Sequence, residues 1–542
     1  MLNLFLLLKR NDYDLMELIV KEQRKKMRRS VTKMRRLIGL LSGVLLVGLL
    51  ASCGSNQEAG KNEELQVLTT FYPMYEFTKE IVGEEGNVEL LIPAGTDSHD
   101  YEPSAKDMTK IQNADIFVYN DENMETWVPA IQETLREGKV LSIKATEGML
   151  LLSGSEDGHD HTHEGEGHTH ELDPHVWLAP SLAVKQVQTI RNQLIKQYPE
   201  KEEVFTSNAE NYLTKLQNLH QKYQDTLGQA KQKSFVTQHA AFNYLALEYG
   251  LKQVAVTGLS SSEEPSVSRI AELKEFVTEH GISTIYFEEN TKGSIAKTLA
   301  NEAGVSLEVL NPLEGLTKEQ MAQGENYLSI MEKNLRALQK TTEIENPLED
   351  RWEQEEKTVY NGYFEDSAVK DRTLLDWNGA WQTVDSYLEN GTLDPVFEYK
   401  AKVNPEKTAK EYKEYYKVGY HTDVAKITIK GNELTFTFKN GEVKKAEYRY
   451  SGKKVLDYQA GNRGVRYLFE AKEPQNSAYR YVQFSDHSIE PSDSEHFHIY
   501  LGNESQEKLL EEMENWPTFY PAQMNGQEIA QEMMLHEAKI PL

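Results

Sequence analysis

A single cysteine, Cys53, stands in a chain of 542 residues. A lone cysteine cannot form an internal disulfide, so its presence needs another explanation. Long apolar runs are missing as well. The longest one begins at Leu37, ends at Ser52 and has 16 residues, fewer than the ~20 that a transmembrane helix needs. The sequence therefore excludes a disulfide-stabilised fold and predicts no membrane-spanning helix.

Positive charge is scarce relative to negative charge. The chain has 59 Lys and Arg residues against 86 Asp and Glu residues, which gives a formal net charge of −27. This balance argues against nucleic acid as a partner, because an excess of negative charge does not neutralise phosphates. The acidic body favours weak attraction of cations, although a solvated acidic surface explains the same number. The length implies more than one domain, each with its own core.

The N-terminal residues have the opposite charge balance, with a basic cluster from Lys21 to Arg36 ahead of the apolar run. Basic residues, a short apolar core and small residues, in that order, indicate an export signal. The run ends in Leu50-Ala51-Ser52-Cys53, which resembles the lipobox of bacterial lipoproteins. The resemblance implies that Cys53 is acylated and anchors the protein at the extracellular face of a Gram-positive-type cell membrane. Ordinary signal cleavage beside an accidental cysteine is the alternative.

Shifts in composition predict the division of the chain. Residues 1–26 do not fit a usual signal peptide, and Met27 or Met34 would be a more natural start. Asn56 to Glu64 reads as a polar tether, and Glu343–Glu349 as a polar, proline-containing connector. The predicted parts are a signal region at 1–52, a lipidated tether at 53–64, a first domain at 65–341, a linker at 342–350 and a second domain at 351–542.

The first domain alternates short apolar runs with amphipathic stretches, which predicts an α/β class with parallel sheets. Glu202–Leu227 lacks proline and carries apolar residues at spacings of four, three and four. It predicts one long helix that joins two lobes, or a helix that packs inside one domain. The predicted strands are Gln66–Phe71, Val88–Ile92, Ile116–Tyr119, Val140–Ile143, Phe235–Thr237, Gln253–Val256, Thr284–Phe287 and Leu307–Leu310.

The second domain is of a different class. Short strand patterns are joined by Gly-Asn, Asn-Gly or Ser-Gly pairs, which favours an antiparallel β-barrel with a few helices. Leu375–Leu388 and Lys508–Trp516 are predicted as helices. The predicted strands are Ile427–Ile429, Leu434–Phe438, Ala446–Tyr450, Arg466–Phe469, Arg480–Phe484 and His496–Tyr500.

Five of the 15 histidines lie in one short segment, GHDHTHEGEGHTH. The segment has no apolar residue to anchor it, so it is expected to be disordered unless something binds. Imidazoles interspersed with carboxylates favour zinc, copper or nickel. We interpret the segment as a metal-collecting loop, the alternative being a solvated low-complexity loop without a role. Its histidines are His159, His161, His163, His168 and His170.

Three further histidines lie at the junctions between predicted elements. His99 follows the strand at 88–92, His175 lies in ELDPHVWLAP, and His239 follows the strand at 235–237. In open α/β sheets, ligands bind outside the carboxyl ends of the strands, where these residues would gather. Each one alone would more commonly be an ordinary core or surface histidine.

The stretch from about Leu65 to Gln339 resembles the zinc-binding solute receptors of ABC importers, the ZnuA and AdcA type. The matching phrases are TDSHDYEPS, DPHVWLAP, TQHAAFNYLA, IYFEENT and NPLEGL, in that order. The resemblance implies that His99, His175 and His239 are metal ligands and that Glu314 is the fourth. It also implies a two-lobed receptor without catalysis, a permease of an ABC transporter as partner, and a monomer.

The fourth ligand has two rivals, Glu288 and Glu289, although the Pro-Leu-Glu-Gly context favours Glu314. Manganese-binding relatives tend to carry a carboxylate where this chain has His239. Three imidazoles and one carboxylate suit four-coordinate Zn²⁺ better than Mn²⁺, which prefers more oxygen ligands. Zn²⁺ is therefore the expected ion.

The region from Trp352 to Leu542 resembles ZinT, a zinc-binding protein with a lipocalin-like barrel. The phrases are DWNGAWQTV, YKEYYKVGYHTDV and SDHSIEPSDSEHFHIYLG. His496 and His498 are two apart on a predicted strand, so both side chains point to one face, and His487 precedes a turn that can bring it beside them. The resemblance implies that these three histidines are zinc ligands. His421 is an additional candidate for which no argument is available.

The expected function is capture of Zn²⁺ between two lobes and its delivery to a membrane permease, with the barrel raising the local zinc concentration. The rival is an extracellular zinc hydrolase, because catalytic zinc also uses three protein ligands and a water. A His-Glu-x-x-His motif, which would supply a general base, is missing. A side role as a surface adhesin stays open.

Overall fold

The computed structural model describes residues 64–154, 172–260, 265–288, 294–345, 358–359, 361–458 and 461–537. The described residues from Glu64 onward belong to one compact unit. The export signal, Cys53, Glu289 and the histidine-rich segment 159–170 lie outside the described residues. No helix within the described ranges is long and apolar enough to cross a membrane.

The first four strands form a parallel sheet in the order β2-β1-β3-β4. β3, with the sequence IFVY, is buried along its whole length. A strand covered on both faces needs a continuous apolar run rather than an alternating pattern, which explains this sequence. The strands are β1 (Leu65–Thr69), β2 (Gly86–Leu90), β3 (Ile116–Tyr119) and β4 (Leu141–Lys144).

The next four strands form a second parallel sheet, in the equivalent order β6-β5-β7-β8. Because the paired strands are parallel, the loops that follow them leave each sheet at the same edge. All eight predicted strands are confirmed: β3 and β7 have the predicted bounds, and the ends of the other six shift by at most two residues. The strands are β5 (Ser234–Thr237), β6 (Lys252–Ala255), β7 (Thr284–Phe287) and β8 (Ser306–Val309).

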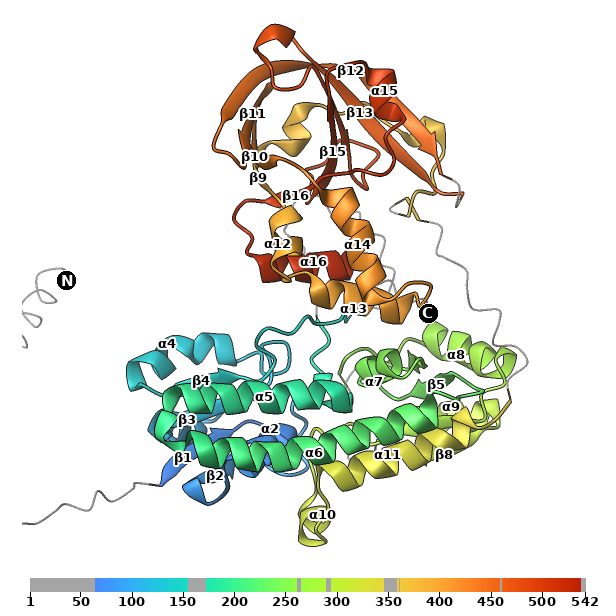
Figure 1. Ribbon diagram of the computed structural model, residues 1–542. Helices are drawn as coiled ribbons and strands as arrows, with labels where there is room; N and C mark the ends of the chain where they lie inside the picture. The colour runs from blue at the N-terminus through green and yellow to red at the C-terminus, as the bar shows by residue number, and fades with distance from the viewer. Residues whose placement is uncertain are drawn as a thin grey trace, which may run out of the picture. The chain divides into compact units, whose positions relative to one another are not determined.

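One 26-residue helix, α6 (Glu202–Leu227), links the two sheets and has the predicted bounds. It packs along α5 and α11, and Figure 1 shows the three helices side by side. The remaining helices of this α/β region cover the sheets. The helices are α2 (Tyr72–Val82), α3 (Ala105–Asn113), α4 (Val128–Gly138), α5 (Pro180–Gln197), α7 (Asn243–Glu248), α8 (Val267–Glu279), α9 (Ser294–Ala303), α10 (Lys318–Ala322) and α11 (Tyr327–Thr342).

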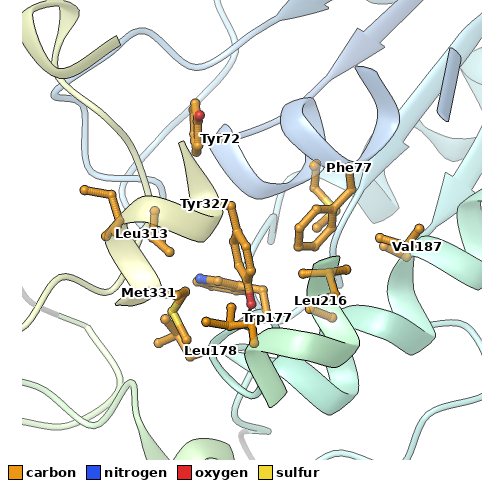
Figure 2. Packing of buried hydrophobic residues seen from close by; sticks show 14 of the residues in the cluster. Tyr72, Phe77, Trp177, Leu178, Val187, Leu216, Leu313, Tyr327 and Met331 are labelled. Carbon is orange, nitrogen blue, oxygen red and sulfur yellow. Dashed lines mark hydrogen bonds between the residues drawn. The ribbon is translucent and has the colours of Figure 1, made fainter. Parts of the chain in front are cut away.

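One apolar cluster contains residues of both lobes of the α/β region, and smaller clusters lie within each lobe. At its centre the Tyr327 ring lies edge-on to Phe77, with 5.0 Å between ring centroids, and Trp177 and Leu216 lie beside them (Figure 2). The Tyr327 hydroxyl donates to the Trp177 carbonyl, and the Trp177 Nε1 donates to the Pro312 carbonyl, so these two buried rings keep their polar atoms satisfied. A shared core of this kind limits independent motion of the two lobes.

The C-terminal strands form a closed antiparallel barrel in the order β10-β11-β12-β13-β14-β15-β16-β9. Closure leaves no exposed sheet edge. The six predicted strands are confirmed: four lie within the observed strands, and the other two begin one residue before β14 and β15. The strands are β9 (Gly379–Thr383), β10 (Val424–Lys430), β11 (Glu433–Phe438), β12 (Val443–Asp457), β13 (Arg463–Ala471), β14 (Tyr481–Ser485), β15 (Phe497–Gly502) and β16 (Thr518–Pro521).

The predicted helix Leu375–Leu388 is wrong. The segment instead holds a short 3-10 turn, the strand β9 and the five-residue helix α12 (Asp385–Glu389). Trp377 and Trp381 have helical spacing, but β9 is needed to close the barrel, where it pairs with both β10 and β16. Long-range pairing therefore overrides the local pattern.

The predicted helix Lys508–Trp516 is also too long, because α15 ends at Leu510. The buried guanidinium of Arg466 donates hydrogen bonds to the carbonyls of Leu509 and Glu512, at 2.6 and 2.5 Å. These carbonyls are therefore not available to continue the helix. The helices of the barrel region are α12, α13 (Asp394–Val403), α14 (Ala409–Tyr420), α15 (Gln506–Leu510) and α16 (Gly526–Glu537).

Candidate metal centres

The structure brings His99, His175, His239 and Glu314 together. Three of them follow strands of the α/β region: His99 comes after β2, His239 two residues after the end of β5, and Glu314 after β8, whereas His175 immediately precedes the 3-10 turn Val176–Leu178. His175 and His239 are fully buried, and the side chains of His99 and Glu314 are each 10% exposed. The cluster therefore forms at the carboxyl ends of strands from both sheets, as expected for a ligand site in an α/β fold.

The spacing of the ligand atoms matches a tetrahedral metal site. The Nε2 atoms of His99 and His175 are 3.2 Å apart, and Glu314 Oε1 lies 3.5, 3.5 and 3.2 Å from Nε2 of His99, His175 and His239. Bonds of about 2.0–2.1 Å to a tetrahedral Zn²⁺ separate the ligand atoms by about 3.3–3.4 Å. Four separations that agree with this value define a centre for one small ion.

Two of the ligand atoms are buried without a hydrogen-bond partner among the described residues. They are His239 Nε2 and Glu314 Oε1, which face each other across the centre of the cluster. Buried polar atoms without partners are costly, and a bound cation would satisfy both. Three neutral imidazoles and one carboxylate are also a donor set that suits zinc.

Carboxylates behind two of the imidazoles orient them. Asp173 Oδ1 lies 2.7 Å from His175 Nδ1, and the Glu288 carboxylate bonds His239 Nδ1. A proton on Nδ1 leaves the lone pair of Nε2 directed into the cluster. Glu288 therefore lies on the far side of the His239 ring, and the structure groups Glu314, not Glu288, with the three histidines.

The same charges control protonation when no ion is bound. Burial disfavours a charged His175, but the adjacent Asp173 outweighs it and raises the pKa of His175. Burial likewise opposes charge on His239, whereas Glu288 raises its pKa well above the ordinary value. Burial would raise the pKa of Glu314, but the histidines around it, His99 foremost, hold that pKa well below normal. Protons and a metal ion thus compete for the same nitrogens.

Residues next to the ligands tie the ligand segments to one another. Ser98 Oγ donates to the Glu314 carbonyl at 3.2 Å, and Trp177 Nε1 donates to the Pro312 carbonyl at 2.8 Å. The loops that carry His99 and His175 are therefore both hydrogen-bonded to the turn that carries Glu314. These hydrogen bonds preorganise the ligand segments for metal coordination.

A second cluster lies on the barrel and consists of His487, His496 and His498. Their ring centroids are 5.3 to 6.3 Å apart. His498 lies on β15, and His496 immediately precedes it, so the strand starts one residue later than predicted. The three rings offer three ligand atoms within 4.8 Å of one another, which leaves room for a fourth ligand.

Neighbouring side chains fix two of these rings. His498 Nδ1 lies 2.8 Å from Thr518 Oγ1, and that hydroxyl donates its own proton to the Trp516 carbonyl at 3.0 Å. Thr518 must therefore accept from His498 Nδ1–H, which leaves Nε2 as the free lone pair. The His496 ring stacks on Tyr520, with centroids 5.0 Å apart and planes 12° apart. Burial, with the charges of His487 and Arg466, lowers the pKa of His498 to about 3, so its imidazole is neutral at physiological pH.

The turn before His487 is anchored by the neighbouring Asp486. Its carboxylate accepts from Arg372 Nη1 at 2.6 Å and from Trp377 Nε1 at 3.1 Å. Arg372 is fully buried and also bonds Asp376 at 2.8 Å. Sequence reasoning did not single out Arg372 or Asp486, although the DWNGAW phrase carries their partners Asp376 and Trp377 and the SDHSIEPSDSEHFHIYLG phrase carries Asp486.

His421 lies outside both clusters. It is exposed and caps the C-terminus of α14, where its carbonyl accepts from Asn515. The structure therefore gives no ligand role to this additional candidate. Sequence reasoning also missed Asp173 as an orienting group, although it lies two residues before His175 in a quoted phrase.

Two protein-family models match the chain. Residues 67–341 match "Zinc-uptake complex component A periplasmic" (ZnuA), and residues 355–536 match "ZinT (YodA) periplasmic lipocalin-like zinc-recruitment". The first match ends in α11, and the second covers the barrel and its helices. The two candidate metal clusters therefore fall one in each matched family region.

Curated relatives span both regions. The zinc-binding lipoprotein AdcA of Streptococcus pneumoniae serotype 4 is 56% identical over 92% of this chain and 99% of its own length. The zinc-binding protein AdcA of Streptococcus pyogenes serotype M3 is 51% identical over 87% of this chain and 94% of its own length. The crystal structure of Zn(II)-bound AdcA from S. pneumoniae aligns with a TM-score of 0.78 at 57% identity, covering 87% of this chain and 99% of that one.

Proposed function

Because this chain belongs to the AdcA family of zinc-binding lipoproteins, we propose that it captures Zn²⁺ outside the cell and delivers it to the permease of an ABC importer. The cargo site is His99, His175, His239 and Glu314. The observation that carries the proposal is the tetrahedral spacing of these ligand atoms, 3.2 to 3.5 Å, with two of them buried and unpartnered. The ion in this site is cargo, and the proposal includes no catalytic step.

The barrel acts as an auxiliary capture site through His487, His496 and His498. Rings fixed by Thr518 and Tyr520 lose little freedom on binding, which favours a defined one-ion site. The histidines at 159–170 collect metal more weakly, since ordering a polar segment around an ion costs chain entropy. The barrel site and the histidines at 159–170 both raise the zinc concentration near the cargo site.

The remaining parts of the proposal concern the anchor and the domains. Acylated Cys53 holds the protein at the extracellular face of the membrane, ahead of a tether at 53–64. The cargo domain extends over 65–341 and the barrel domain over 351–542, joined by the linker at 342–350. We propose that the protein works as a monomer; all four candidate cargo ligands come from a single chain.

The decisive experiment measures zinc bound to the mature chain after dialysis against a weak chelator. The parent carries His487→Ala, His496→Ala and His498→Ala, so that the cargo site dominates the count. Adding His239→Ala should reduce bound zinc to near zero, and adding Glu314→Ala should weaken binding less, since water can replace a carboxylate.

The matched control is His421→Ala, an exposed histidine outside both clusters, which should leave the count unchanged. Full zinc retention by the His239→Ala variant would refute the cargo site. A peptidase and esterase screen of the zinc-loaded chain tests the absence of catalysis, and turnover that disappears with the barrel ligands would favour the hydrolase.

A further inference from the structure

The last helix of the barrel region holds a backbone segment of the α/β region. The Gln531 side chain, on α16, accepts from Leu151 N at 2.8 Å and donates to Leu151 O at 2.6 Å. One amide side chain thus satisfies both polar groups of a residue 380 positions earlier in the chain. Leu151 is 5% exposed, so without Gln531 these groups would lose their partners in a largely dry environment.

Apolar packing surrounds this amide bridge. Leu150 packs against the helical core of the barrel region. A separate buried cluster combines side chains of both regions: Leu151, Leu152, Val176, Ala179 and Tyr244 from the α/β region, and Tyr399 and Met534 from α13 and α16. At the exposed rim, Lys402 pairs with Glu248 at 2.5 Å. The contact therefore has a buried centre and a charged rim, as specific protein interfaces do.

Hydrogen bonds continue from Leu151 to the cargo site. Its neighbour Leu152 donates through N to the Tyr244 hydroxyl at 2.9 Å and accepts through O from Asp173 N at 2.9 Å. The Tyr244 hydroxyl in turn donates to the Asp173 carbonyl at 2.6 Å. Asp173 is the residue whose carboxylate orients His175. Three consecutive links thus connect an α16 side chain to the segment that carries a cargo ligand.

We propose that Gln531 is a positioning residue for the cargo site, so that docking of the barrel stabilises the zinc-competent arrangement of Asp173 and His175. The proposal rests on the proposed function, because it takes His175 as a zinc ligand. Gln531 does not touch the ion and acts through Leu151 and Leu152. Because coupling is reciprocal, zinc in the cargo site must also strengthen the docking of the barrel.

The direction of the effect follows from the geometry. Releasing Leu151 loosens the pairing of Leu152 with Asp173, so the Asp173 carboxylate no longer holds His175 Nδ1 as firmly. Loss of a carboxylate that orients a metal-bound histidine lowers metal affinity by about 10–100-fold. Gln531 acts on Asp173 only through Leu151 and Leu152, so its effect should be smaller than that of Asp173 itself. We expect the removal of the Gln531 side chain to speed zinc release from the cargo site by about three- to tenfold.

The test uses the mature full-length chain with the three barrel ligands replaced by Ala as parent. Gln531→Ala and Gln531→Glu are compared with Lys402→Ala, which breaks only the exposed rim pair. Zinc release into excess chelator is measured by stopped-flow, and hydrogen exchange is followed in peptides covering 149–153 and 172–178. Gln531→Ala should accelerate both. Gln531→Glu, which can accept from Leu151 N but cannot donate to Leu151 O, should lie between Gln531→Ala and the parent, and Lys402→Ala should stay within twofold of the parent.

Each other outcome overturns the proposal. Unchanged exchange at 149–153 in Gln531→Ala would mean that the bridge does not form in solution. Faster hydrogen exchange at 149–153 with unchanged zinc release would mean that the Gln531 contact is merely structural. If Lys402→Ala speeds zinc release as much as Gln531→Ala does, the effect would belong to docking in general and not to Gln531. His175→Ala, run in the same assay, separates the two claims: if it leaves the slowly released zinc in place, the proposed cargo site fails whatever Gln531 does.

Discussion

Asn334 on α11 forms two hydrogen bonds with the backbone of Asn311: its Nδ2 donates to the Asn311 carbonyl at 2.7 Å, and its Oδ1 accepts from Asn311 N at 2.9 Å. The Asn311 side chain then accepts from Leu313 N at 2.8 Å. Leu313 has a φ of +58°, a left-handed conformation that is costly for a branched residue. This chain of bonds holds the backbone in the conformation that turns Glu314 towards the histidines.

We therefore expect Asn334→Leu to weaken zinc binding at the cargo site as well as to destabilise the protein. Two buried backbone groups lose their partners, which costs about 2–4 kcal/mol of unfolding free energy, and Glu314 is no longer held in place. Zinc affinity is measured by chelator competition, and stability by denaturant unfolding.

The matched control is Asn208→Leu, which removes the bond from Asn208 on α6 to the Ile81 carbonyl on α2, two residues that lie outside the ligand cluster. It should lower stability and leave zinc affinity unchanged. If Asn334→Leu and Asn208→Leu have the same zinc affinity, Asn334 has no positioning role.

Asp173 provides a second test of ligand orientation. Asp173→Ala removes the acceptor for His175 Nδ1–H, and we expect a 10–100-fold loss of zinc affinity. Asp173→Asn keeps an oxygen acceptor without the charge, and its loss should be smaller. Isothermal titration of both variants in the barrel-ligand-free parent measures the difference. Equal affinity of the Ala variant and the parent would contradict the orienting role.

The elements that local pattern determines were predictable. The bounds of α6 match because its apolar residues repeat at helical spacing without proline. β7 matches because Thr284–Phe287 is a short apolar run between polar stretches. β9 was not predictable, since Trp377 and Trp381 are spaced as in a helix and only barrel closure decides otherwise. The local sequence of such a segment does not show that it will pair with distant strands.

The candidate ligands were predictable from motifs, whereas the groups that orient them were not. Glu288 was a rival for the fourth ligand because the sequence does not show which nitrogen of the His239 ring it approaches. The two residues are 49 positions apart, and the structure places the Glu288 carboxylate at Nδ1. Thr518 reaches His498 from the next strand of the barrel, 20 residues on. Orienting contacts depend on how strands and loops meet in the folded chain. A hydroxyl or carboxylate that is tens of residues away in the sequence cannot be distinguished, from the sequence alone, from an ordinary surface residue.

Thr518 therefore gives a prediction for the barrel site. Thr518→Val has nearly the same shape but cannot accept from His498 Nδ1–H, so the ring can rotate or shift its proton to Nε2. We expect zinc affinity at the barrel site to fall by about tenfold or more, with the zinc count at the cargo site unchanged. Thr383→Val, a buried threonine on β9 outside the histidine cluster, is the control. A barrel site equally weakened by both changes would point to general loosening of the barrel.

The last prediction concerns pH and Lys400 on α13. Its Nζ lies 4.8 Å from the centre of the Tyr416 ring, and burial lowers the pKa of Lys400 to about 7. The unfolded chain, with an ordinary lysine pKa near 10.4, then binds more protons than the folded chain between about pH 7 and pH 10. Stability contributed by this group therefore rises with pH through that window, and below pH 7 the full cost of a buried charge is present.

Lys400→Met removes that cost. We expect the variant to melt at a higher temperature than the parent at pH 6, with a gain that shrinks or disappears by pH 9. Calorimetric scans of the metal-free chain at both pH values measure it, because bound zinc would add its own pH dependence. Lys410→Met, at an exposed position on α14, controls for loss of a surface charge and should show no such trend. A Lys400→Met gain that is as large at pH 9 as at pH 6 would mean that packing, and not the buried charge, accounts for the stabilisation.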